Sequence, residues 1–330
     1  MMRSLYSGVS GLKNHQTRMD VIGNNIANVN TVGYKTSRVV FQDIFSQTAK
    51  SGTMSLYDPT DTTSRNIGGT NPIQIGLGIK LATVDVLHTP APITRTDNPF
   101  DAMIEGDGFF IVQDENMNYY YTRAGNFYLD DEGYLVSSHG YFVMGYTYAL
   151  NVIEPEKAAP DDDPPTPYIP PTIEVDYDGL LSPTLEKIRL REPNPFYEGI
   201  DDPSDPDYMG PEFIDLIGFS IGNDGSVSVV IDNIKETIAY LGIAMFSNNA
   251  GLDKAGNSLY RESPSSGAAV FSMALQNGAG RVVGGGLEMA NVDLATEFTD
   301  MIITQRGFQA NSRVITVSDT LLEELINLKR

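Results

Sequence analysis

The chain of 330 residues contains no cysteine, which excludes disulfide bonds and thiol chemistry. It has no run of eighteen apolar residues, so a membrane-spanning helix is excluded. Basic residues number only 22 against 43 acidic ones, and the net charge of −21 argues against a nucleic-acid-binding protein. The three histidines show no metal-ligand spacing. What remains is a chain long enough for two or three domains with sizeable cores.

The most regular pattern lies at the C-terminal end, in residues 284–330. Large apolar side chains recur there at a spacing of seven, at Leu287, Leu294, Met301, Phe308, Ile315 and Leu322. This spacing predicts a helix with one face against a partner helix. Phe298, Ile302, Leu325 and Ile326 widen the apolar face. We expect Phe298, Ile302 and Ile326 to meet helices of neighbouring subunits. Asn291 is the expected N-cap of the helix.

The N-terminal 40 residues show the same period. The apolar positions are Leu5, Leu12, Met19 and Ile26, with Val9 and Ile22 beside them. They predict an amphipathic helix over about residues 4–27 that pairs with the C-terminal helix in an inner coiled-coil core domain. Five basic residues and one acidic residue give this region a charge of +4, so binding to a membrane surface is an alternative. Polar residues interrupt its apolar positions, which argues against a cleaved signal peptide.

Between the helices, short strand-like segments alternate with turn residues. Residues 41–71 are polar and are interpreted as a connector, and residues 72–150 and 216–283 as two parts of one β domain. Asn223-Asp224-Gly225 predicts a hairpin turn in the second part. The predicted fold class is α+β, mainly β, with a discontinuous antiparallel sandwich or barrel-like domain between N- and C-terminal α-helices.

An acidic, proline-rich insertion at residues 151–215 separates the two β parts. It holds thirteen of the nineteen prolines, and its four basic and seventeen acidic residues give a net charge of −13. Proline removes sheet donors and like charges repel, so this insertion is expected to be a short outer domain or an extended loop.

Patterns that would indicate an enzyme are incomplete. The glycine run from Gly278 to Gly286 misses both the dinucleotide fingerprint and the P-loop, and we interpret it as a flexible joint. Asp161-Asp162-Asp163 could attract a hard cation, but the glycine and distal glutamate of an EF-hand are missing. A nucleotide- or metal-binding enzyme therefore remains only an alternative. We expect no catalytic residue, no cofactor and no metal.

The two ends resemble one known family. Residues 1–12 read MMRSLYSGVSGL, residues 22–35 read IGNNIANVNTVGYK, and residues 287–294 read LEMANVDL. With QRGFQANSR at 305–313, these segments are similar to the bacterial flagellar rod and hook family. Three internal segments match as well and occur in the family's order: IEGDGFF at 104–110, TRAGNF at 122–127 and MFSNNAGL at 245–252.

Within that family the resemblance is greatest to the hook branch, on residues 294–299, LATEFT, and on the ending LINLKR at 325–330. The insertion at 151–215 lies where hook subunits carry an extra outer domain, although it is short here. The distal rod branch shares the terminal motifs and is the alternative.

The resemblance implies a structural subunit of the flagellar hook and basal body. It implies self-assembly through the terminal helices into a homopolymer, a curved flexible tube that acts as a universal joint and passes motor torque to the filament. It also implies export by the flagellar type III apparatus without a cleaved signal peptide, and a location outside the cell. The implied partners are the hook cap protein during assembly and the distal rod and hook–filament junction proteins at the two ends.

Overall fold

The computed structural model describes residues 2–54, 69–153, 172–176, 185–193, 213–215, 217–231 and 234–328. The chain divides into two compact units. Unit 1 consists of Met1–Val29, Thr36–Leu87 and Val292–Arg330, and unit 2 consists of Asn30–Lys35 and His88–Asn291. The chain therefore passes four times from one unit to the other, and both terminal segments belong to unit 1.

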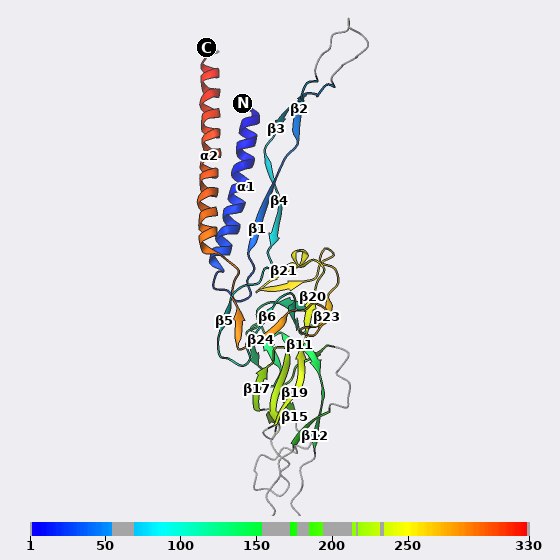
Figure 1. Ribbon diagram of the computed structural model, residues 1–330. Helices are drawn as coiled ribbons and strands as arrows, with labels where there is room; N and C mark the ends of the chain where they lie inside the picture. Colours follow the sequence, from blue (N-terminus) through cyan, green and yellow to red (C-terminus); the bar gives the residue numbers. More distant parts are fainter. Residues whose placement is uncertain are drawn as a thin grey trace, which may run out of the picture. The chain divides into compact units, whose positions relative to one another are not determined.

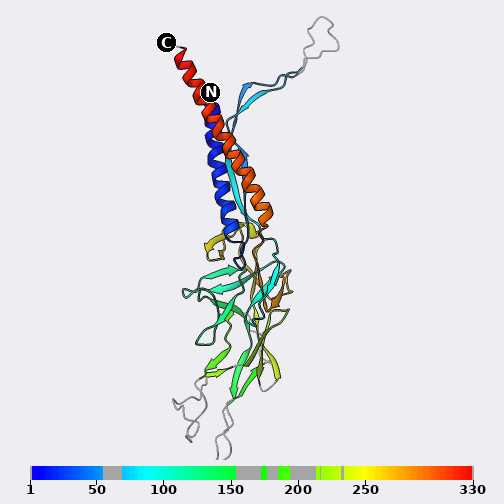
Figure 2. The same ribbon diagram turned by 90° about the vertical axis from the view of Figure 1, so that its left-hand side faces the viewer.

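Unit 1 contains the two helices, α1 (Met2–Ala27) and α2 (Leu294–Asn327). They lie side by side and run antiparallel, as Figures 1 and 2 show. The predicted pairing of the terminal helices is therefore confirmed. Neither helix has an apolar stretch long enough to cross a membrane.

The C-terminal helix is shorter than the sequence predicted. It begins at Leu294, although the spacing of seven extends back to Leu287 and the expected N-cap was Asn291. Its N-cap is Asp293, whose Oδ1 accepts a hydrogen bond from the backbone N–H of Ala295 at 3.0 Å. The side chain of Asn291, the predicted cap, instead donates to Thr89 Oγ1. The residues from Arg281 to Glu288 form two strands, so the glycine run there is not the flexible joint that we expected.

Unit 1 also contains a two-stranded antiparallel ribbon that consists of two successive strand pairs. It is formed by β1 (Ser37–Asp43), β2 (Ser46–Lys50), β3 (Ile73–Gly76) and β4 (Ile79–Val86), in which β1 pairs with β4 and β2 with β3, both antiparallel. Strands β1 and β4 lie against α1 (Figure 2). Residues 41–54, part of the predicted connector, therefore contain strand structure, because backbone pairing holds polar segments as well as apolar ones.

Unit 2 holds the remaining strands and a short 3₁₀ helix, η1 (Asn249–Gly251). The strands are β5 (Ile93–Arg95), β6 (Ala102–Glu105), β7 (Phe109–Gln113), β8 (Tyr119–Thr122), β9 (Phe127–Leu129), β10 (Leu135–Ser137), β11 (Phe142–Thr147), β12 (Ala149–Ile153), β13 (Thr172–Asp176), β14 (Glu186–Lys187), β15 (Arg191–Pro193), β16 (Phe213–Asp215), β17 (Ile217–Ile221), β18 (Ser226–Ile231), β19 (Ile234–Leu241), β20 (Ile243–Met245), β21 (Asp253–Gly256), β22 (Leu259–Arg261), β23 (Val270–Ser272), β24 (Arg281–Gly284) and β25 (Gly286–Glu288).

The main sheet of unit 2 is antiparallel and has the order β17-β18-β19-β11-β7-β8-β22-β21. It joins strands from both sides of the acidic insertion, because β19 follows the insertion and pairs with β11, which precedes it. Strand β11 also pairs with β10 and β14, and β20 pairs with β7. The predicted discontinuous, mainly β fold is confirmed.

The core of unit 2 lies along the central strands. All five residues of β7 are buried, which explains its nearly continuous apolar sequence. Phe110 packs edge-on against Phe127, and Val227 and Val229 of β18 reach the same core. The predicted turn at Asn223-Asp224-Gly225 is present, with Gly225 at a φ of 76°. Most of the insertion at 151–215, including Asp161–Asp163, lies outside the described residues; its described parts include the strand pairs β12–β13 and β15–β16.

Candidate functional site

The seam between α1 and α2 holds the line of apolar residues that the sequence predicted. Met301, Phe308, Ile315 and Leu322 are half-buried. On α1, Ile22 is buried, and four further predicted residues are half-buried, namely Leu5, Leu12, Met19 and Ile26. The spacing of seven therefore places these side chains on one buried face of the helix pair.

The same seam contains a second, polar set of residues on α2. Glu297, Thr304, Asn311 and Ser318 alternate with the apolar line at steps of three and four, and each is buried or half-buried. Asn25 Nδ2 donates to Glu297 Oε1 at 3.0 Å, and the Oγ atoms of Ser4 and Ser318 are 3.4 Å apart. The face of α2 that meets α1 thus carries polar as well as apolar side chains, which the apolar periodicity could not show.

Other predicted residues are exposed. On α2 these are Leu294, Phe298, Ile302 and Ile326, with exposed fractions from 38% to 67%, and on α1 Val9 is exposed as well. Leu287 is not on the helix: it lies in β25, which pairs with β5. Its spacing of seven from Leu294 does not reflect a continuous helix face.

A larger exposed apolar set follows α2 to its C-cap, and the sequence interpretation included only Leu325 of it. We call it the outer stripe: Ile303, Ala310, Val314, Val317, Leu321, Leu325 and Leu328. Among its large side chains the exposed fraction runs from 42% for Val314 to 82% for Leu328, and Ala310 is exposed as well. The steps of three, four and seven between these residues bring them to one side of a helix. This periodicity is present in the sequence, but it is less regular than the line of six residues at a spacing of seven that predicts the seam.

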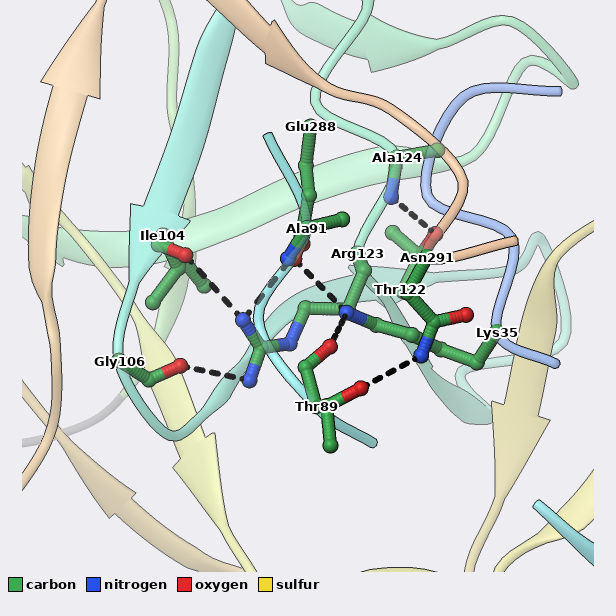
Figure 3. A network of polar contacts seen from close by, with 10 residues as sticks. All are labelled: Lys35, Thr89, Ala91, Ile104, Gly106, Thr122, Arg123, Ala124, Glu288 and Asn291. Carbon is green, nitrogen blue, oxygen red and sulfur yellow. Dashed lines mark hydrogen bonds and ion pairs between the residues drawn. The ribbon is translucent and has the colours of Figure 1, made fainter. Parts of the chain in front are cut away.

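Unit 2 contains a buried network of charged side chains (Figure 3). Lys35, Arg123 and Glu288 are each at most 1% exposed. Lys35 Nζ lies 2.7 Å from Glu288 Oε1 and donates to the backbone oxygen of Thr89, while Arg123 Nη1 lies 3.6 Å from Glu288 Oε2. Three segments that adjoin chain crossings, residues 30–35, 88–91 and 286–291, are thereby bound to one another.

Burial dominates the electrostatics of this network. It lowers the pKa of Lys35 and of Arg123 from their ordinary values, and the neighbouring Glu288 carboxylate partly offsets both shifts. Arg123 also donates to the backbone oxygens of Ile104 and Gly106, so its guanidinium has partners on two sides (Figure 3). The arrangement holds these segments in place.

The three histidines have separate surroundings. The His15 ring lies against Gly307 and Phe41 in unit 1. His88 is packed edge-on against Phe109 and Tyr260 in unit 2, and burial together with nearby Lys35 lowers its pKa to about 4. His139 is exposed in the turn before β11. Among the described residues, no group of His, Cys, Asp or Glu side chains has the arrangement of a metal site.

The chain thus combines two paired terminal helices with an antiparallel β unit that lies between them in the sequence, the α+β, mainly β class that its pattern predicted. Three family models match the chain: "Flagella basal body rod protein" at residues 5–35, "Flagellar hook protein FlgE/F/G D1 domain" at 103–229, and "Flagellar basal body rod FlgEFG protein C-terminal" at 283–328. The chain belongs to the flagellar rod and hook family, a structural family of the bacterial flagellum.

Two curated relatives cover the whole chain. Flagellar basal-body rod protein FlgG of Bacillus subtilis (strain 168) is 42% identical over 332 residues, and flagellar hook protein FlgE of Borreliella burgdorferi is 32% identical over 450 residues, with 100% of both chains covered in each case. Family membership implies self-polymerisation into the axial structure of the flagellum and a place in its basal body or hook.

The three matched regions meet in the ion network. Lys35 lies in the first region, Arg123 in the second and Glu288 in the third. Each also belongs to a segment that carries the family resemblance, but nothing in the sequence indicates that Lys35 and Arg123 both contact Glu288.

Proposed function

We propose that this chain is a non-catalytic axial subunit that polymerises through its terminal helices, and that neighbouring copies cover the outer stripe together with Leu294, Phe298, Ile302 and Ile326. The observation that supports this most directly is the exposure of these side chains on a helix whose seam is already occupied by α1. Soluble monomers rarely leave a large contiguous apolar surface uncovered.

The energies involved favour a polymer over a single contact. Complete burial of a large apolar side chain contributes about 1.5–3 kcal/mol, so covering a half-exposed one contributes on the order of 1 kcal/mol. Ten such side chains would therefore gain about as much as the 4–15 kcal/mol that association costs. When a subunit contacts several neighbours, more apolar surface is buried, but the free-energy cost of association does not rise in proportion. A head-to-tail contact that does not close into a ring produces a helical filament.

Of the two branches, we propose the rod first and the hook second. The relative named as a rod protein is the more similar of the two, and its alignment of 332 residues is nearly the length of this chain. The alignment with the hook relative extends to 450 residues, so that protein contains segments without a counterpart here. The acidic insertion at 151–215 is the feature that favours a hook subunit, in which it would be a short outer domain.

The further partners follow from this assignment. At its two ends a rod would meet other axial proteins, and a hook would meet the distal rod and the hook–filament junction proteins. A cap protein would support growth of a hook, and the flagellar type III apparatus would export either subunit without removal of an N-terminal segment. Mass spectrometry of the subunit from isolated flagella tests the last point, because a cleaved signal peptide would shorten the chain.

The assembly proposal is tested on the outer stripe. Replacing Val314, Val317 and Leu321 together by serine should leave a folded, soluble chain that forms no sedimentable tubes. The matched control replaces the exposed polar residues Gln309, Thr316 and Thr320 of the same helix by serine and should assemble normally. Normal tubes from the stripe variant would contradict the proposal. Electron microscopy of the parent tubes would then separate a straight rod from a curved hook.

A further inference from the structure

The pairing of α1 with α2 keeps one register along its whole length. Asn25 contacts Glu297, His15 lies against Gly307, and the backbone of Gly11 lies against Asn311. Ser4 then meets Ser318. The same number of residues separates Asn25 from Ser4 as separates Glu297 from Ser318, so the two helices keep step without a slip.

The apolar residues of the seam do not define this register by themselves. On α2 they repeat every seven residues from Met301 to Leu322, and on α1 they repeat every seven from Leu5 to Ile26. If one helix slides by seven residues, every apolar side chain in the overlap again meets an apolar position. A strictly periodic apolar seam therefore allows several registers of similar stability. In coiled coils, polar residues in the seam select one of these registers at a cost in stability.

His15 and Gly307 form a contact that depends on the register. A Cβ atom at Gly307 would lie 2.8 Å from Cε1 and 2.9 Å from Nε2 of His15, so the imidazole occupies space that only glycine leaves open. After a slip of seven residues, His15 would face Asp300 or Val314 instead. Either side chain would fill the space that the ring needs.

Asn25 and Glu297 form a second such contact. Asn25 is 1% exposed, and its Nδ2 donates to Glu297 Oε1 at 3.0 Å and to the backbone oxygen of Ser37 at 2.9 Å. Its Oδ1 accepts from the backbone N–H of Ser37 at 3.0 Å. In the observed register, Glu297 and Ser37 therefore accept from the two N–H groups of this amide. A slip would place Thr304 or residue 290, which lies outside α2, at that position.

We infer that His15 with Gly307 and Asn25 with Glu297 are positioning residues that select the register of the helix pair, a selection that the repeating apolar line cannot make. If the proposed assembly through the outer stripe holds, this register also fixes the height of that stripe relative to α1 and β1 in every subunit. A uniform height lets identical neighbours add in identical positions.

Disulfide trapping in dilute monomer tests this inference, and the absence of native cysteine gives it no background. The pair Ser4→Cys with Ser318→Cys reports the observed register. Ser4→Cys with Leu325→Cys, and Ser4→Cys with Asn311→Cys, report slips of seven residues in the two directions. Seven residues correspond to about 10.5 Å along a helix, whereas a disulfide needs Cα atoms within about 7 Å. Each cysteine pair therefore reports one register.

The reporters are placed in the parent chain and in His15→Ala/Gly307→Ala/Glu297→Leu. We expect the parent to form the observed-register disulfide, and the variant to raise the ratio of slipped to observed product at least about tenfold, equivalent to about 1.4 kcal/mol of register preference. Gln16→Ala/Gln309→Ala, changed at exposed positions of the same helices, should behave like the parent. If circular dichroism shows that the triple variant has lost helix, the double variant His15→Ala/Gly307→Ala is compared with the parent instead. This double variant should keep its helices because a change from glycine to alanine favours helix formation.

Two results would overturn the inference. One is an unchanged product ratio in folded variants, which would mean that the apolar line suffices. The other is the absence of the observed-register disulfide in the parent. Neither result depends on tube formation, so failure of this inference is distinguishable from failure of the assembly proposal.

Discussion

The Nζ atom of Lys35 lies 2.7 Å from Oε1 of Glu288, and both side chains are completely buried. Lys35 belongs to the segment that follows α1, and Glu288 ends β25, the last strand before α2. The pair therefore binds together the two segments that lead to the helices. A buried charge that loses its partner keeps its desolvation cost, so a single change at this pair should be severe.

Glu288→Ala would leave Lys35 and Arg123 buried without their carboxylate. We expect it to lower the free energy of unfolding of unit 2 by about 3–5 kcal/mol. Urea titration followed by tyrosine fluorescence measures this, because all but Tyr6 and Tyr57 of the seventeen tyrosines belong to unit 2.

The matched control for that change is Glu105→Ala, which removes the partner of Arg281. That pair is just as close, at 2.6 Å, but each side chain is 53% exposed. Exposed pairs contribute about 0–1 kcal/mol. Equal losses of stability from the two changes would show that burial does not set the strength of the Lys35–Glu288 pair.

Two glycines near the end of α1 should respond to alanine in opposite directions. Gly33 has a φ of 67°, and a Cβ there would lie 2.6 Å from the backbone nitrogen of Ala124. Gly33→Ala should therefore destabilise unit 2 by about 1–2 kcal/mol for the left-handed backbone alone, before the collision is counted. Gly23 lies within α1 with nothing within 4 Å of a new Cβ, so Gly23→Ala should stabilise the helix by about 1 kcal/mol. Thermal unfolding followed by circular dichroism distinguishes them, and a stabilising Gly33→Ala would be inconsistent with this geometry.

The helix pair and most of the main sheet were predictable because the pattern of apolar residues in the sequence is typical of a helix or of a strand. The seam line from Met301 to Leu322 and strands such as β7 and β18 follow directly from the spacing of apolar side chains. The same reasoning misplaced the start of α2, since Leu287 continues the spacing of seven although it belongs to a strand. The spacing of apolar residues predicts which side chains face inward. It does not predict where a helix ends and a strand, held by backbone hydrogen bonds to another strand, begins.

The ion network and strands β1 and β2 of the ribbon in unit 1 could not be predicted for a different reason, whereas β3 and β4 lie where the sequence predicted strands. Nothing in the sequence distinguishes Lys35, Arg123 and Glu288 from exposed charged residues. They become buried only because three distant segments of the chain meet. Strand β2 is exposed at every position, so it carries no alternation of apolar and polar residues for a sequence pattern to detect. Both features depend on tertiary contacts between segments far apart in the chain.

The assignment of the N-cap to Asp293 can be tested against the predicted cap, Asn291. Asp293 Oδ1 accepts from the Ala295 N–H and Oδ2 accepts from Thr296 Oγ1, and the bond from Thr296, followed by that from Ala295, lowers the pKa of Asp293. Asp293→Ala should lower the midpoint of the helix transition measured by circular dichroism, whereas Asp293→Asn should largely preserve it because asparagine is also a good cap. Asn291→Ala should leave that transition unchanged, since Asn291 bonds Thr89 in unit 2. A larger effect at Asn291 than at Asp293 would contradict the assignment.

His88 should make the stability of unit 2 depend on pH. Burial, aided by Lys35, Arg123 and Lys254, lowers the pKa of its imidazole to about 4, from an ordinary value of 6.5. Between these two values the unfolded chain binds the proton and the folded chain does not, so stability falls as the pH is lowered from 6.5 towards 4. The loss contributed by this group is on the order of 3 kcal/mol.

The difference between parent and His88→Phe isolates this contribution from that of the many carboxylates. Phenylalanine can keep the edge contacts with Phe109 and Tyr260 and does not titrate, so urea titrations at pH 7 and pH 4 should show a smaller loss of stability in the variant. His139→Phe, at an exposed position in a turn, serves as the matched control and should retain the parent's pH dependence. If His88→Phe lost as much stability as the parent over this range, the imidazole would have to be accommodated in its charged form, and the surrounding cations would not oppose its protonation.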